Sequence, residues 1–189
     1  MRRSMASMLV ALGALSTRLA AQSGGAIGVG FAATLGGGWQ IESGEIGYVR
    51  RSTYGPFRAL SLGARVGSYT DEGAIIGGNR GFVFAPTFAA RTGRLMLAEL
   101  GDENNLTQIG FDVTLEGTWY LTTNPPDSLR STWGAVALLP GLRIGGTDGT
   151  QYGIVIGPTM FLGGGAKSEV RGLLAFRVEA PLARREHHP

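Results

Sequence analysis

Apolar and polar side chains alternate through residues 108–120, and this pattern limits the possible folds more than any other part of the sequence. Successive side chains of a β-strand point to opposite faces. The pattern therefore predicts one apolar face, which includes Phe111 and Val113, and one polar face, which includes Asp112 and Glu116. Strands of soluble proteins usually have about 5–6 residues, whereas a strand tilted across a bilayer needs ~9–11. The length of this segment favours a membrane-spanning strand.

Seven further segments have the composition of strands, and glycine-rich or proline-rich turns separate them. The eight expected strands cover residues 25–37, 39–51, 57–69, 80–91, 107–120, 131–144, 150–162 and 169–181. Residues 92–106 are compatible with a ninth short strand, a helix or part of a hairpin. Because single-chain bacterial barrels have an even number of strands, we expect an all-β, antiparallel, up-and-down transmembrane β-barrel of eight strands, with ten as the second choice.

The side chains on the two faces of the expected strands differ in size as well as in polarity. The chain has 32 glycines among 189 residues, more than twice the ~7% background, and many of them alternate with large apolar side chains. A narrow barrel has an interior just wide enough for side chains to fill, so small residues and paired charges suit a lumen. The candidate lumen charges are Arg58, Arg65, Asp112, Glu116, Glu169, Arg171, Arg177 and Glu179. The alternative is a solvated sheet face with ordinary surface charges.

Tryptophan and tyrosine fall mainly at the ends of the expected strands. Amphipathic rings favour the boundary between lipid and water, so this placement predicts the aromatic girdles of a membrane barrel. The candidate girdle residues are Trp39, Tyr54, Tyr69, Trp119, Tyr120, Trp133 and Tyr152.

The amino terminus has the layout of a secretory signal peptide, with a basic start, a short apolar run over 8–15 and small residues before Gln22. We therefore expect residues 1–21 to be a cleaved signal peptide and residues 22–189 to form the barrel domain with a short polar tail. The formal charge of +3 comes from Arg2, Arg3 and Arg18 in the expected signal. The balanced remainder gives no indication of nucleic-acid binding.

Taken together, the alternating strands and aromatic ends over residues 25–181 resemble the small bacterial outer-membrane β-barrels of the OmpA-transmembrane-domain and OmpX type. The resemblance rests on pattern, because no diagnostic motif carries it. It implies a location in the bacterial outer membrane. The implied partners are outer-membrane lipid, lipopolysaccharide and the barrel-assembly machinery.

Residues with obvious catalytic chemistry are few. Outer-membrane lipid A deacylases and acyltransferases depend on a histidine with a serine, but the histidines of this chain are His187 and His188 in the terminal tail. We therefore expect a non-enzyme without cofactor or metal. The leading function is a structural, adhesive or loop-mediated binding role with a charge-plugged lumen. The alternatives are a narrow pore for small solutes and a soluble periplasmic lipocalin-like barrel that holds an apolar ligand.

Overall fold

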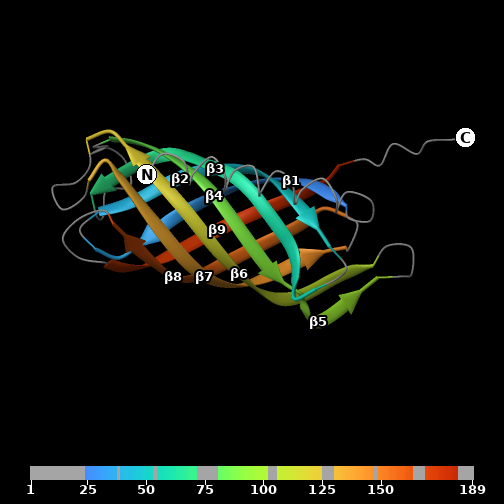
Figure 1. The fold of residues 1–189 in the computed structure, drawn as a ribbon. Coiled ribbons are helices and arrows are strands. Elements are labelled where there is room, and N and C mark those ends of the chain that lie inside the picture. Colours follow the sequence, from blue (N-terminus) through green and yellow to red (C-terminus); the bar gives the residue numbers. More distant parts are fainter. Residues whose placement is uncertain are drawn as a thin grey trace, which may run out of the picture.

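The protein is an all-β, antiparallel barrel closed by eight strands, as expected from the sequence (Figure 1). The computed structural model describes residues 24–37, 39–52, 55–71, 81–101, 106–124, 130–146, 149–163 and 169–182. The expected signal peptide, Tyr54 and the two histidines lie outside these residues. The strands are β1 (Gly25–Leu35), β2 (Trp39–Arg51), β3 (Phe57–Asp71), β4 (Gly81–Thr92), β5 (Leu95–Leu100), β6 (Thr107–Thr122), β7 (Thr132–Gly145), β8 (Gln151–Leu162) and β9 (Glu169–Pro181).

The eight strands other than β5 form the barrel, and we call them the barrel strands. Each pairs with the barrel strands that precede and follow it, and β1 pairs with β9 to close the sheet. Figure 1 shows β1 beginning and β9 finishing at the same end of the barrel, which we call the terminal end. The opposite, distal end includes the tight connection from β1 to β2. Gly36 and Gly37 adopt φ values of 86° and 89° there, a conformation that glycine enters without steric penalty.

Residues 95–100, within the segment 92–106 that could have been a strand, a helix or part of a hairpin, form strand β5. Strand β4 pairs with residues 114–122 of β6, and β5 pairs with residues 107–111 of the same strand. Strand β5 is therefore a ninth strand that continues β4 along one edge of β6, and it adds nothing to the number of strands around the barrel. In Figure 1 it projects at the terminal end.

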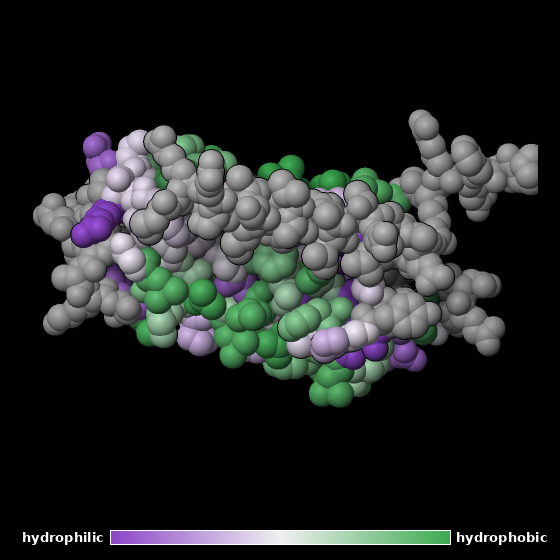
Figure 2. All heavy atoms as spheres, viewed as in Figure 1, coloured by the Kyte–Doolittle hydropathy of each residue, from purple (hydrophilic) through white to green (hydrophobic). Residues whose placement is uncertain are grey.

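The outer surface is apolar around the whole barrel, and all eight barrel strands contribute large exposed side chains to it. These side chains include Ile27, Val29, Phe31, Ile46, Leu62, Val66, Phe88, Leu115, Leu138, Ile154, Ile156, Met160, Leu174 and Phe176. Figure 2 shows part of this apolar belt in green. Among the described side chains of the barrel strands, strand alternation puts three charges on the outer face, Glu42, Arg50 and Arg58, and each lies toward a strand end.

The strands are also as long as membrane-spanning strands need to be. The eight barrel strands have 11 to 16 residues, at or above the ~9–11 that a tilted membrane strand needs. The part of the chain that the structure describes contains no helix long and apolar enough to cross a membrane.

Candidate functional site in the barrel interior

Most of the charged side chains of the barrel strands point inward and form two ion-pair clusters. The central cluster consists of Glu45, Arg65, Glu116 and Arg177. The terminal cluster, nearer the terminal end, consists of Arg51, Arg91, Asp112, Arg143 and Glu179. Strands from all sides of the barrel supply these groups, so the clusters link distant parts of the wall.

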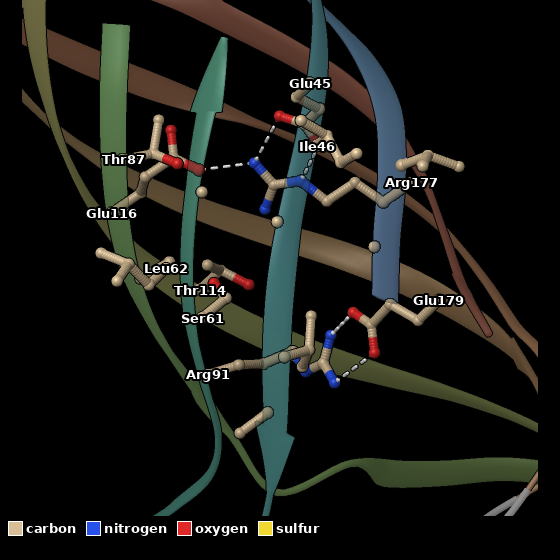
Figure 3. Close-up of a pocket in the computed structure, with 17 residues that line it drawn as sticks. Glu45, Ile46, Ser61, Leu62, Thr87, Arg91, Thr114, Glu116, Arg177 and Glu179 are labelled. Carbon is tan, nitrogen blue, oxygen red and sulfur yellow. Dashed lines mark hydrogen bonds and ion pairs between the residues drawn. The ribbon is translucent and has the colours of Figure 1, made fainter. Parts of the chain in front are cut away.

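In the central cluster, each arginine contacts both glutamates. Nη2 of Arg65 lies 2.7 Å from Oε1 of Glu116 and 3.1 Å from Oε2 of Glu45. Arg177 donates from Nε to Oε1 of Glu45 at 2.6 Å and from Nη2 to Oε2 of Glu116 at 2.5 Å (Figure 3). Two positive and two negative groups therefore form a neutral ring, which reduces the penalty for burying them.

Strand register brings three of these four residues together, whereas Glu116 reaches them from β6, which pairs with β4 and β7. Glu45 faces Arg65 across β2 and β3, and Gly30 of β1 lies directly between Glu45 and Arg177. A Cβ atom at Gly30 would be 2.8 Å from Oε1 of Glu45. The missing side chain at Gly30 thus leaves the space in which Glu45 and Arg177 meet.

The terminal cluster is organised around Glu179. Arg91 donates two hydrogen bonds to its carboxylate, at 2.5 and 3.1 Å, and Arg143 donates one to Oε1 at 2.9 Å. Nε of Arg143 also donates to Oδ2 of Asp112 at 2.8 Å. Paired N–H donors fit a carboxylate in a fixed geometry, so these contacts hold β4, β7 and β9 in one arrangement.

A small cavity of about 60 Å³ separates the two clusters on the side of β2, β3 and β4. Figure 3 shows Arg177 and Glu116 on one side of it and Arg91 with Glu179 on the other, with Ser61 and Thr114 between them. Charged and hydroxyl groups share its lining with small and apolar residues, and it has room for a few water molecules. It is well below the ~300–1,000 Å³ of ordinary small-molecule sites.

Apolar side chains fill much of the rest of the interior, together with buried hydroxyl groups such as Thr34 and Thr159. Leu139, Val155 and Leu173 are buried on the opposite side of the barrel from the cavity. At the distal end, aromatic rings pack against one another, with Trp39 stacked on Phe161 at 5.8 Å and Tyr120 stacked on Trp133 at 5.3 Å between ring centroids. Aromatic pairs at these separations stabilise one another beyond their buried area.

One charged residue belongs to this distal aromatic cluster. The Arg171 guanidinium lies 3.8 Å from the centroid of the Trp39 ring, in a cation–π contact. It also donates to the backbone carbonyl of Trp39 and lies 2.8 Å from a carboxylate oxygen of Glu169. Among the described residues, aromatic rings and the paired Arg171 thus account for much of the filling at the distal end.

The structure distributes the eight candidate lumen charges unequally. Arg65, Asp112, Glu116, Arg171, Arg177 and Glu179 are buried or partly buried in the interior and paired. Glu169 lies at the distal mouth with a side chain that is 41% exposed. Arg58 is exposed and lies outside both clusters, because it shares the strand face of Leu60.

Sequence reasoning missed Glu45, Arg51, Arg91 and Arg143, which complete the two clusters. A signal for them was present. Glu45 alternates with Gly44 and Ile46, and Arg143 alternates with Leu142 and Ile144, so strict alternation in β2 and β7 assigns both charges to the inner face.

The aromatic girdle requires a correction. Trp39, Tyr69, Tyr120 and Trp133 are buried in the distal aromatic cluster, so their assignment to a girdle was wrong. Trp119 and Tyr152 are exposed by 53% and 50% and do lie on the outer face. The assignment relied on position near a strand end and ignored alternation, which turns adjacent residues such as Trp119 and Tyr120 to opposite sides.

Within the described residues, no group of three or more histidine, cysteine, aspartate or glutamate side chains could hold a metal ion. Neither a protein-family model nor a curated protein matches the sequence.

Proposed function

We propose that the protein is an integral outer-membrane β-barrel with a filled interior and a non-enzymatic role in structure, adhesion or binding through its loops. The observation that carries the proposal is the distribution of polarity. Large apolar side chains cover the outside of all eight barrel strands, while the ion pairs lie inside. A soluble barrel normally has the opposite distribution.

A bilayer explains this distribution physically. Within lipid, every backbone polar group must be satisfied by the protein itself, which a closed barrel achieves. An outward Arg or Lys at the midplane costs roughly 2–4 kcal/mol and much less near the interfaces. The outward positions of Glu42 and Arg50 near strand ends agree with that depth dependence.

The two alternative functions fit the interior less well. A pore for solutes needs an open path, whereas here the distal aromatic cluster and two ion-pair clusters occupy successive levels of the barrel. A lipocalin-like barrel needs an apolar interior large enough for its ligand, whereas the cavity here is only about 60 Å³ and five charged side chains help to line it. The partners that accompany the proposal are outer-membrane lipid, lipopolysaccharide and the barrel-assembly machinery.

Fractionation and fluorescence quenching test the location together with the facing of the strands. The mature protein should fractionate with outer membranes and resist extraction by urea. In liposomes that contain brominated lipid, a variant that retains only Trp119 (Trp39→Phe with Trp133→Phe) should be strongly quenched. The matched variant that retains only Trp133 should be quenched several-fold less, because that ring is 1% exposed inside the barrel.

The opposite results would contradict the proposal. Recovery of the protein in the soluble periplasm would exclude an integral membrane barrel. Stronger quenching of Trp133 than of Trp119 would mean that the inner face in the structure is the one that meets lipid.

A further inference from the structure

Close approach of β2 and β3 keeps open the cavity between the two ion-pair clusters. Gly47 of β2 and Gly63 of β3 face each other in the sheet, and both line the cavity. A Cβ atom at Gly47 would lie 2.9 Å from the carbonyl oxygen of Leu62, and one at Gly63 would lie 2.5 Å from that of Ile46. These distances leave no room for a side chain at either position, so the space between the clusters stays unfilled.

Thr114 lies at the step between the two clusters. The inward residues Asp112, Thr114 and Glu116 follow one another on β6, so Thr114 has the terminal cluster on one side and the central cluster on the other. Thr114 is 2% exposed and lines the cavity, and its hydroxyl has no hydrogen-bond partner among the described residues. A buried hydroxyl without a partner is unfavourable, which points to a ligand that the barrel strands do not supply.

Other polar groups converge on the same space. The hydroxyls of Ser61 and Thr87 share the lining with Thr114. The side chain of Arg177, which also lines the cavity, keeps 14% of its surface accessible. Its hydrogen bonds in the central cluster use Nε and Nη2, and Figure 3 shows the third nitrogen of the guanidinium directed toward Ser61 and Thr114. The cavity is therefore surrounded by donors and acceptors at close range.

We infer that the cavity binds a small cluster of water molecules, anchored on the Thr114 hydroxyl, that joins the central and terminal clusters into one hydrogen-bonded network. The volume of about 60 Å³ is several times the ~10–15 Å³ that one water molecule needs. Cavities that stay dry are apolar, and a buried water needs ~2–4 polar partners. The hydroxyl and charged groups of the lining provide such partners.

The lining disfavours an ion as the occupant. Three of its five charged side chains are carboxylates, those of Glu45, Glu116 and Glu179, and these would repel an anion. In the part of the chain that the structure describes, acidic side chains form no group that could hold a metal ion. Water is neutral and both donates and accepts hydrogen bonds. It can therefore satisfy a hydroxyl, a carboxylate and a guanidinium in the same small space.

The bound waters make the two clusters dependent on each other. On the opposite side of the barrel, the buried side chains of Leu139, Val155 and Leu173 offer no polar connection. Bridging waters are nearly as favourable as direct hydrogen bonds, and groups in one network respond non-additively to substitution. This inference concerns the interior alone, so it goes beyond the proposed function and does not depend on the membrane location.

Crystallography of the refolded full barrel, at a resolution that shows ordered water, tests the occupancy. Ordered waters should fill the cavity, with at least one within hydrogen-bond distance of Oγ1 of Thr114. Thr114→Val keeps the shape of the side chain without its hydroxyl and should lose that water, whereas Thr114→Ser should retain it. Thr159→Val is the control, because it removes a buried hydroxyl that does not line the cavity and should leave the waters in place.

A double-mutant cycle tests the connection between the clusters. The equilibrium constant for unfolding in urea is measured for Glu116→Gln, for Glu179→Gln and for both together. The combined effect should differ several-fold from the product of the single effects. This difference should shrink several-fold in a Thr114→Val background and persist in Thr114→Ser. If Thr114→Val does not fold, Gly28→Ala adds a methyl group to the cavity with no contact closer than 3.4 Å and should weaken the connection in the same way.

Three results would overturn the inference. They are a cavity without ordered water, an ion in place of the waters, and a non-additive effect that survives in both Thr114→Val and Gly28→Ala. Each measurement is made on the folded barrel, so these results would leave the proposed membrane location untouched.

Discussion

At the scale of single residues, Glu116 is the counter-ion of two arginines. It is 2% exposed, and its two carboxylate oxygens contact Arg65 and Arg177, which come from different strands. Removing the carboxylate would leave two guanidinium groups with only Glu45 between them. An unpaired buried charge is much more expensive than a lost surface pair, so this position should be among the most sensitive in the barrel.

Glu116→Ala is expected to lower the free energy of unfolding by about 3 kcal/mol, at the low end for breaking a buried ion pair from one side. Urea titration of the reconstituted barrel, followed by tryptophan fluorescence, measures the change. Glu169→Ala is the control, because its partly exposed pair with Arg171 should contribute less than about 1 kcal/mol. Similar small effects at both positions would indicate that bulk water reaches the central cluster.

At the scale of elements, strand boundaries could be predicted from the sequence to within about two residues, because alternation and turn chemistry are local signals. The charge partners could not be predicted in the same way. Which side chains meet across a lumen depends on the stagger of strands around the barrel, a property of the closed sheet. The pairing of Arg91 with Glu179 is an example, since β4 and β9 are not neighbours in the sheet.

Strand β5 is likewise defined by its neighbours. It has the apolar composition of a barrel strand, but its described pairing is with β6 alone, whereas β4 lies between β3 and β6. Local composition could not distinguish these two situations. The difference between β4 and β5 should be measurable as the protection of their backbone amides from hydrogen exchange.

Amides of residues 95–100 should exchange with deuterium at least tenfold faster than those of residues 83–91. One hydrogen-bonded neighbour gives less protection against local opening than two. Hydrogen–deuterium exchange with mass spectrometry on the barrel in nanodiscs measures both segments in one experiment. Equal protection would show that β5 is covered on its second edge in the membrane.

At the scale of the whole molecule, the interior is filled in layers. The terminal cluster, the central cluster with the adjacent cavity, and the distal aromatic cluster follow one another along the barrel axis. An eight-stranded barrel is narrow enough for side chains to close it. The layers use different chemistry, so no single substitution is expected to open a continuous path.

The wild-type barrel should therefore show no steady ion conductance in a planar bilayer. The recording is made on protein whose folded state is checked by its altered gel mobility without heating, and a known porin serves as the positive control. Glu116→Ala should remain closed as well, because the aromatic layer is intact. Stable single-channel steps from the wild type would favour the pore over the filled barrel.

The pairing of β1 with β9 has a consequence for the order in which the barrel assembles. These strands lie at opposite ends of the described chain, yet they share a ladder from Ala26 with Pro181 to Leu35 with Gly172. Contacts so distant in sequence are slow to form. Until residues 172–181 have paired with β1, that strand has no second neighbour, so the assembling barrel keeps an open edge that must be shielded until its last strand is in place.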